Sequence, residues 1–294
     1  MPATVEEAFD RFLPTLATSL KESQSAASHR TSVEARLKSD FGLKTMFRTG
    51  SFGAGTNVRG YSDVDYFAVI PTANLKANSG VTLAKVAQSM RERFPLTPNI
   101  RVNGPGVQIP FGDDGAERVE IIPVDETGQT KLGFRSFDMP NEAGGWKFSS
   151  PESHKAYVDE IDTRLGGKLK PLIRLAKAWK FYRNVPIRSF YLEMRVAAMM
   201  EQEQVILYEI DLKNVLRALW DDQLANVSDP RFPNDGFVLS ACSSASSRTD
   251  ALSKLANAAT WSEQAMAHKH DNKPSAAIGK WNLVFADRFP KYGL

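Results

Sequence analysis

The stretch that decides the fold runs from residue 50 to residue 65 and reads Gly50-Ser51-Phe52-Gly53-Ala54-Gly55-Thr56-Asn57-Val58-Arg59-Gly60-Tyr61-Ser62-Asp63-Val64-Asp65. Its glycines predict a loop, and the apolar, β-rich run of residues 64–70 predicts a buried central strand. Asp63 and Asp65 stand at the mouth of this strand, where side-chain alternation places both carboxylates on one face. Two adjacent carboxylates repel each other unless a cation lies between them. The pair therefore predicts a site for a hard ion such as Mg²⁺.

Residues on either side of this pair supply two more parts of a phosphate-handling site. Glycines let a backbone approach a phosphate closely, so the amides around Gly50 and the hydroxyl of Ser51 form a candidate phosphate site. Glu120 is a lone acid in the strand-like run of residues 118–123, and a neighbouring strand would present it beside the aspartates. A third carboxylate is the usual completion of a two-metal site. The alternative, surface turn residues, is disfavoured because both aspartates lead into a buried strand.

The patterns along the rest of the chain predict a mixed α/β lobe followed by a helical lobe. Before residue 125, helical spacing covers residues 3–20, 28–38 and 81–94. Strand patterns cover residues 44–48, 99–109 and 117–124, with turn residues at 112–115. Residues 125–150 are rich in glycine, proline and polar residues and predict a lobe boundary. Helical patterns then cover residues 154–165, 169–182, 189–210 and 212–220, with a last pair of helices after a turn at 229–236.

Composition restricts the class of protein. The chain has 294 residues, 42% of them hydrophobic and 24% charged, and a net charge of +3, which is typical of a globular protein. A single cysteine, Cys242, excludes a disulfide framework within the chain and disfavours a cysteine-based zinc site. The first residues lack the features of a signal peptide, and no apolar stretch approaches the ~18–20 residues of a membrane span. We therefore expect a cytoplasmic protein without a membrane segment.

The order Gly-Ser, loop, Asp-x-Asp and later acid resembles the signature of DNA polymerase β-like nucleotidyltransferases. Residues 172–179, Leu-Ile-Arg-Leu-Ala-Lys-Ala-Trp, resemble a helix of oligoadenylate synthetases and their bacterial relatives. Residues 189–193, Ser-Phe-Tyr-Leu-Glu, resemble the next motif, and Asp229-Pro230 with Asn234 resembles a third. From about residue 10 to residue 285, this order is similar to that of the CD-NTases. These bacterial relatives of cyclic GMP–AMP synthase make cyclic oligonucleotide signals in CBASS antiphage defence.

This resemblance implies an α+β fold with a bilobed polymerase β-like nucleotidyltransferase core. Residues 1–150 would hold the N-terminal helices and the α/β core, and residues 151–294 a helical lobe that closes over the nucleotide.

The resemblance also implies a role for each matching residue. The metal ligands and catalytic acids would be Asp63, Asp65 and Glu120, holding two Mg²⁺ or Mn²⁺ ions. The nucleotide would be bound by Gly50, Ser51, Lys177 and Ser189, with Phe190 stacking on a base. A solvated helix residue remains the alternative for Lys177, and a core residue for Phe190. Many members have Asp where this chain has Glu120, which is still a hard oxygen ligand.

The predicted activity is synthesis of a cyclic di- or trinucleotide from nucleoside triphosphates, ATP or GTP by resemblance, with release of pyrophosphate. The predicted partners are these substrates, a downstream effector reached through the product, and regulatory proteins. The vertebrate DNA sensor carries a cysteine-rich zinc insertion that this chain lacks, so direct activation by nucleic acid is not expected. Two alternatives stay open: transfer to a tRNA end, protein or small-molecule hydroxyl, and a non-catalytic nucleotide-binding scaffold. Base identity, ring size and linkage are left open by the sequence.

Overall fold

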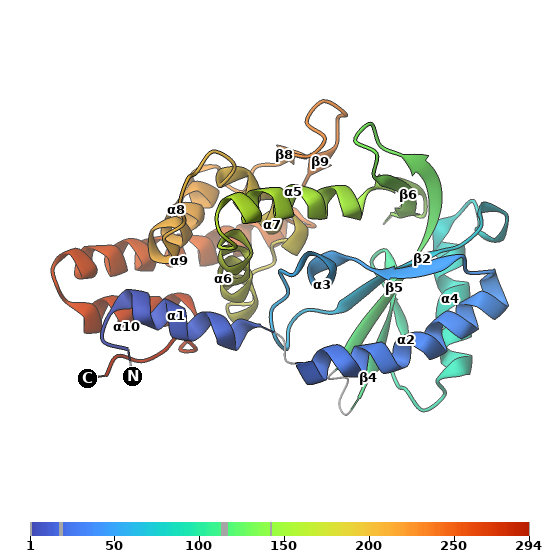
Figure 1. Ribbon diagram of the computed structural model, residues 1–294, viewed down its shortest axis with the longest axis horizontal. Helices are drawn as coiled ribbons and strands as arrows, with labels where there is room; N and C mark the ends of the chain where they lie inside the picture. The colour runs from blue at the N-terminus through green and yellow to red at the C-terminus, as the bar shows by residue number, and fades with distance from the viewer. Residues whose placement is uncertain (1, 18–19, 113–116, 142, 294) are drawn as a thin grey trace. The chain divides into compact units, whose positions relative to one another are not determined.

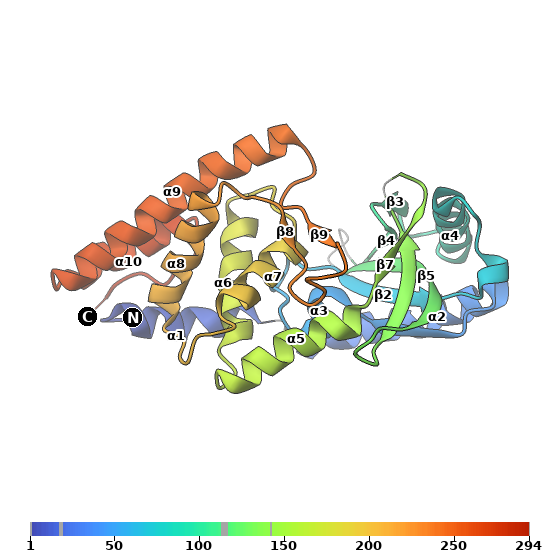
Figure 2. The same cartoon turned by 90° about the horizontal axis from the view of Figure 1, so that it is seen from above.

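The chain folds into two compact units. The computed structural model describes residues 2–17, 20–112, 117–141 and 143–293. The sheet unit comprises residues 18–156, and the helical unit comprises residues 1–17 together with residues 157–294. Figure 1 and Figure 2 show the elements that make up each unit. This division differs from the predicted one in two places, because the first helix joins the helical unit and the boundary falls after Ala156.

Within the described residues, seven strands form the mixed sheet of the sheet unit. Their order is β1-β2-β5-β4-β3, and β6 pairs with the far end of β5 and with β7. β2 and β5 run parallel, whereas their other neighbours run antiparallel to them. The strands are β1 Thr45–Arg48, β2 Val64–Val69, β3 Arg101–Asn103, β4 Gly106–Phe111, β5 Glu117–Gln129, β6 Arg135–Pro140 and β7 Trp146–Ser149.

Helices α2 (Leu20–Phe41) and α4 (Ser79–Arg93) cover one face of this sheet. Alternation along β2 sends Val64, Tyr66 and Ala68 into the core with these helices. The intervening residues of β2 point to the opposite face, where Phe67 and Val69 pack with Ile122, Val124 and Phe137. Asp65 therefore lies on the face that the two helices leave open.

The helical unit consists of helices and one short hairpin. α5 (Pro151–Arg164) begins in the last residues of the sheet unit and continues into the helical unit. The hairpin is formed by β8 (Val227–Ser228) and β9 (Val238–Leu239). The other helices are α1 Val5–Leu16, α6 Leu169–Tyr182, α7 Ser189–Met199, α8 Tyr208–Asp221, α9 Ala245–His270 and α10 Pro274–Val284.

Helix α1 belongs to the helical unit because its apolar face is buried against the end of the chain. The ring of Phe9 lies 5.0 Å from that of Trp281, and the ring of Phe12 lies 4.7 Å from that of Phe285. Lys269 of α9 adds an ion pair to Glu6 and a second, 2.8 Å long, to Glu209. Aromatic burial and ion pairing thus fix α1 to segments far away in the sequence.

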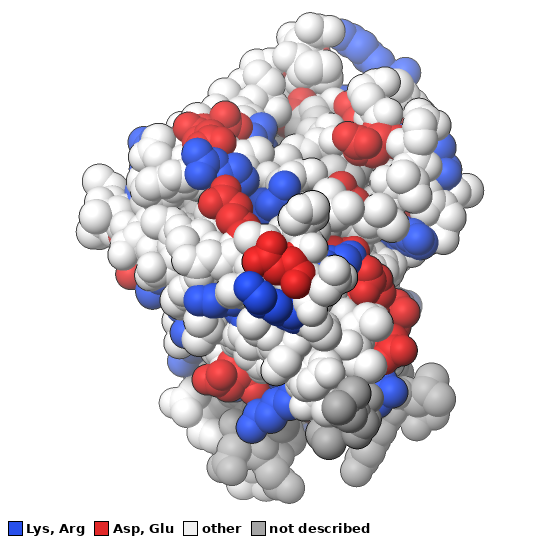
Figure 3. Space-filling model, turned by 90° about the vertical axis from the view of Figure 1, so that its left-hand side faces the viewer, with Lys and Arg blue, Asp and Glu red and all other residues white. Residues whose placement is uncertain are grey.

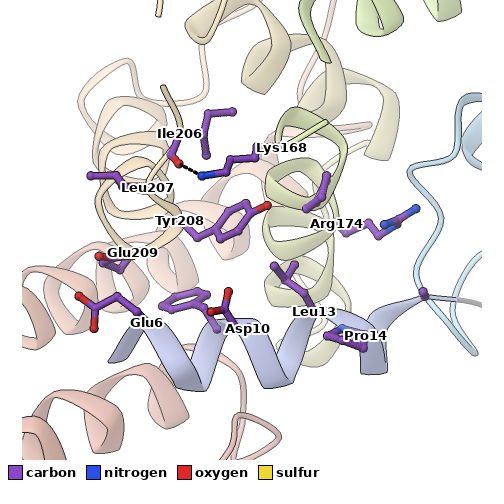
Figure 4. Close-up of a pocket in the computed structure, with 13 residues that line it drawn as sticks. Glu6, Asp10, Leu13, Pro14, Lys168, Arg174, Ile206, Leu207, Tyr208 and Glu209 are labelled. Atoms are coloured by element: carbon purple, nitrogen blue, oxygen red, sulfur yellow. Dashed lines mark hydrogen bonds between the residues drawn. The ribbon is translucent and has the colours of Figure 1, made fainter. Parts of the chain in front are cut away.

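A pocket of about 520 Å³ lies between α1, α6 and the start of α8 (Figure 4). Leu13 and Pro14 of α1 line it together with Tyr208 and Arg174. Lys168 donates a 3.2 Å hydrogen bond to the carbonyl of Ile206 at its edge. The predicted site residues do not line this pocket.

Two predicted elements of the sheet unit are wrong. Residues 50–54 form a short helix, α3 (Gly50–Ala54), where a loop was expected, and Gly55 ends it with a φ of 73°. Residues 125–150 were expected to be a lobe boundary, but they contain the end of β5 together with β6 and β7. β5 pairs with β6 from Asp125 onward, directly beyond the point where β2 ends, and a bulge between Glu126 and Gly128 shifts the register of this pairing.

Three other expectations are corrected in their bounds. The strand expected over residues 99–109 is the pair β3 and β4, because a turn at residues 104–105 divides it. The helix expected over residues 28–38 covers Leu20–Phe41, and the one expected over 189–210 ends at Met199. Most of the turn expected at residues 112–115 lies outside the described residues.

The surface in Figure 3 carries basic and acidic side chains close to one another rather than in separate fields. The small net charge of +3 therefore does not concentrate in one broad basic area on this face. Among the described helices, none combines the length and the apolar character that crossing a bilayer requires.

Candidate active site

The parallel pairing of β2 with β5 brings the predicted acids together. Asp65 of β2 is the register partner of Glu120 of β5, so both carboxylates project from the same face of the sheet. Asp63 lies directly before β2, two residues from Asp65. The register of β2 and β5 therefore places Asp63, Asp65 and Glu120 near one another, as the sequence predicted.

The pKa of Glu120 depends on its burial and on the two neighbouring acids. Burial and then the negative charge of Asp63 raise the pKa of Glu120 from 4.5 to about 7, whereas hydrogen bonding with Asp65 and Asn103 lowers it. The Asn103 amide donates to Glu120 Oε1 over 3.5 Å. The pKa of Glu120 is thus raised first by burial and second by the negative charge of Asp63.

Gly50 and Gly106 have no side chain, and this makes room for the carboxylates of Asp65 and Glu120. Gly50 has a φ of +57°, and a Cβ added to it would overlap the Asp65 carboxylate. A Cβ added to Gly106 of β4 would lie 2.5 Å from Glu120 Cγ. Any larger residue would push the carboxylates away, so glycine is required at both positions. Ser51 follows Gly50 in α3, and its carbonyl accepts a 2.9 Å hydrogen bond from the amide of Thr56.

The donor set fits a hard divalent cation, because three carboxylates on one face are the ligands that Mg²⁺ and Mn²⁺ prefer. Within the described ranges, however, no group of three His, Cys, Asp or Glu side chains converges closely enough to hold an ion. Both carboxylate oxygens of Asp63 are instead engaged by side chains of β4 and β5.

The sequence did not predict the two side chains that contact Asp63, those of Arg118 and Gln108. Arg118 Nε lies 2.7 Å from Asp63 Oδ1, and the Gln108 amide donates to Asp63 Oδ2 over 3.1 Å. Gln108 is directly opposite Glu120 in the β4–β5 register. Both had a signal in the sequence: Gln108 is a polar residue between Val107 and Ile109, and Arg118 lies two positions before Glu120.

In the helical unit, Lys177 lies in the protein interior. Its side chain, on α6, is 1% exposed and forms an ion pair with Glu193 of α7, itself 6% exposed. A buried lysine needs such a counter-charge, because an unpaired charge in the interior is strongly unfavourable. The lysine expected to bind a triphosphate is thus engaged by a carboxylate of its own unit.

Lys180, one turn further along α6, is the lysine that meets the predicted serine. Lys180 Nζ donates a 2.8 Å hydrogen bond to Ser189 Oγ. Burial and the positive charge of Lys177 lower the pKa of Lys180 to about 8. The next residue, Phe190, is 45% exposed, so it is not a core residue.

The fold and the three acids Asp63, Asp65 and Glu120 can be compared with those of known protein families. The family model of the Second Messenger Oligonucleotide or Dinucleotide Synthetase domain matches residues 3–161, just over half of the chain. The chain therefore belongs to this family, and its predicted membership of the CD-NTase class of nucleotidyltransferases is confirmed.

Among known proteins, the chain is similar to the cyclic AMP-AMP-AMP synthase of Escherichia coli (strain MS 115-1), with 26% identity over 169 residues. That match covers 55% of this chain and 52% of the relative, so the chain matches about half of the relative's length.

Solved structures share the whole fold. Vibrio cholerae DncV cyclic AMP-GMP synthase, in complex with a linear intermediate, has a TM-score of 0.78 and 13% identity, and the match covers 99% of this chain and 97% of that one. Escherichia coli MS115-1 CdnC, in complex with HORMA-deltaN, has a TM-score of 0.75 and 17% identity, covering 97% and 98%. These similarities confirm the predicted α+β fold.

Proposed function

We propose that this protein joins nucleoside triphosphates into a cyclic di- or trinucleotide and releases pyrophosphate. The observation that carries the proposal is the placement of Asp65 and Glu120 as register partners on adjacent parallel strands, with Asp63 close enough to raise the pKa of Glu120. Family membership agrees with it, since the family model is named for second messenger synthesis.

The acids would hold divalent cations, Mg²⁺ or Mn²⁺. When bound, such ions neutralise developing charge, favour ionisation of the attacking hydroxyl and stabilise the leaving pyrophosphate. Asp63, Asp65 and Glu120 would supply the oxygen ligands. Gly50 keeps a Cβ out of the space that the Asp65 carboxylate occupies. The Ser51 hydroxyl is proposed to bind the triphosphate.

In the proposed first step, a ribose hydroxyl of one nucleotide attacks the α-phosphorus of another. The new P–O bond forms as the bond to pyrophosphate breaks, and the hydroxyl proton passes to solvent water. The same step, repeated on the linear product, closes the ring.

For the helical unit, Lys177, Ser189 and Phe190 remain proposed nucleotide contacts, and Lys180 joins them. Lys180 and Ser189 are proposed to bind the triphosphate together, because their hydrogen bond holds a cation beside a hydroxyl. Lys177 would then support them from the interior through its charge and its pairing with Glu193. Phe190, with its exposed ring, is proposed to stack on a base.

ATP is the proposed substrate, alone or with GTP, because the curated relative is named for a product of AMP units and DncV for one of AMP and GMP. A role in antiphage signalling through a downstream effector is proposed on the same grounds. A regulatory protein partner is proposed because CdnC has been solved in complex with HORMA-deltaN.

The test is incubation of the purified protein with all four triphosphates and Mg²⁺ or Mn²⁺, followed by mass spectrometry of phosphatase-treated products. A phosphatase-resistant cyclic species is expected from the wild type and from the control variant Glu126→Ala, whose exposed side chain is on the same strand as Glu120. Asp63→Ala should give none. A linear adduct would support transfer to another hydroxyl instead, and triphosphate binding without pyrophosphate release would support a scaffold.

A further inference from the structure

Both carboxylate oxygens of Asp63 are engaged by side chains of the sheet. Arg118 Nε is 2.7 Å from Oδ1, and the Gln108 amide donates to Oδ2 over 3.1 Å. Gln108 is held in turn, because its Oε1 accepts a 2.8 Å hydrogen bond from Arg101 Nη2. Arg118 also donates to the carbonyl of Tyr61 over 3.4 Å. Each carboxylate oxygen of Asp63 therefore has a protein partner in this conformation.

Arg118 owes its position to the strand that carries Glu120. Residues two apart on β5 project from the same face, so Arg118 and Glu120 stand side by side over the site. Unlike Gln108, which is buried, the Arg118 side chain is 41% exposed. A half-exposed arginine is able to leave its partner at small cost, because exposed ion pairs contribute little to stability.

A divalent cation and the guanidinium compete for the same oxygen of Asp63. Each needs a position within about 3 Å of a carboxylate oxygen, and two cations in that position would repel each other. Gln108 presents no such conflict on the other oxygen, since it is neutral. Removing the guanidinium should therefore both free the oxygen and make the site more negative.

We propose that Arg118 is a positioning residue that keeps the metal site in a closed resting form, in which its guanidinium stands in for the divalent cation on Asp63. The cation binds by exchanging with Arg118, and the site then converges on the ion. This inference rests on the proposed function, and it adds that the metal-free and metal-bound forms differ in the partner of Asp63.

The test measures Mn²⁺ binding to the intact, nucleotide-free protein, with the free ion monitored by electron paramagnetic resonance. Arg118→Gln should bind Mn²⁺ about fivefold or more tightly than the wild type, since about 1 kcal/mol of ion pair no longer opposes the ion. Arg118→Lys keeps the charge, so its Mn²⁺ affinity should lie between those of the wild type and Arg118→Gln. Asp63→Asn in the Arg118→Gln background should abolish the gain.

Arg101→Gln is the matched control, because it removes an arginine of the same network that does not contact Asp63. Its Mn²⁺ affinity should stay within about twofold of the wild type, as expected for loss of a more distant, screened charge. Equal tightening by Arg101→Gln and Arg118→Gln, or no tightening by Arg118→Gln, would overturn the inference. The proposed function is tested separately by product formation: a wild type that makes cyclic product while Arg118→Gln binds Mn²⁺ unchanged refutes only the role of Arg118.

Discussion

Glu120→Gln is expected to make the metal-free protein more stable, although it removes a residue on which the proposed reaction depends. Burial and the charge of Asp63 raise the pKa of Glu120 from 4.5 to about 7. In the unfolded chain the carboxyl regains its ordinary pKa, so between these values the folded state retains a proton that the unfolded state has lost. The stability contributed by this proton is fully present below pH 4.5 and is lost as the pH rises through about 7.

The size of the effect follows from the two pKa values. The pKa of Glu120 rises from 4.5 to about 7 on folding, and each pKa unit corresponds to about 1.4 kcal/mol. Ionisation of Glu120 therefore lowers the unfolding free energy of the wild type by about 3 kcal/mol at pH 8, but by only about 1 kcal/mol at pH 5.5. Glutamine is neutral at both pH values. The advantage of Glu120→Gln should therefore grow by about 2 kcal/mol from pH 5.5 to pH 8, or about 4–8 °C in Tm for a protein of this size.

The assay is thermal and urea unfolding of both proteins at the two pH values, in the presence of a chelator. Glu126→Gln, an exposed change on the same strand, should leave stability unchanged at both. Adding Mg²⁺ should stabilise wild type more than Glu120→Gln. If Glu120→Gln gains nothing between pH 5.5 and pH 8, burial and the charge of Asp63 do not raise the pKa of Glu120 as described.

Three further predictions test other parts of the account. Gly50 and Gly60 have φ values of +57° and +73°, so Gly50→Ala and Gly60→Ala should each lose about 1 kcal/mol of unfolding free energy to backbone strain. Only Gly50→Ala should also lose pyrophosphate release, because its Cβ displaces the Asp65 carboxylate. Equal activity of the two would contradict that reading. Lys177→Met should lower the unfolding free energy measured in urea by about 3–5 kcal/mol, because the buried Glu193 loses its ion-pair partner. Adding Glu193→Leu should recover most of this loss, and no recovery would show that the two residues are not coupled. Lys180→Met should raise the KM for ATP about tenfold while folding is retained, and an unchanged KM would remove Lys180 from the triphosphate site.

The acids of the sheet unit were predictable from sequence because strand periodicity determines which side chains share a face. Asp63 and Asp65 precede and enter an apolar strand, and Glu120 interrupts another, so only the pairing of the two strands was missing. The parallel register supplies it. Arg118 and Gln108 were not predicted, because their contacts with Asp63 depend on the order of β2, β5 and β4 in the sheet.

Long-range packing also explains what the sequence did not predict in the helical unit. The motif around Lys177 was recognised, but burial of its side chain depends on how α7 packs on α6 and brings Glu193 to it. Assignment of the first helix failed for a similar reason. Its apolar face indicated burial, but its partners, including Trp281, lie at the other end of the chain.

The central claim, that the three carboxylates form a metal site for nucleotidyl transfer, is tested most directly by pyrophosphate release from ATP and GTP with Asp65→Asn. This change preserves the shape of the side chain and removes its charge. The account predicts metal-dependent release by the wild type, accompanied by a cyclic product, and a loss of at least about a hundredfold in Asp65→Asn. Release by Asp65→Asn at the wild-type rate would contradict the claim.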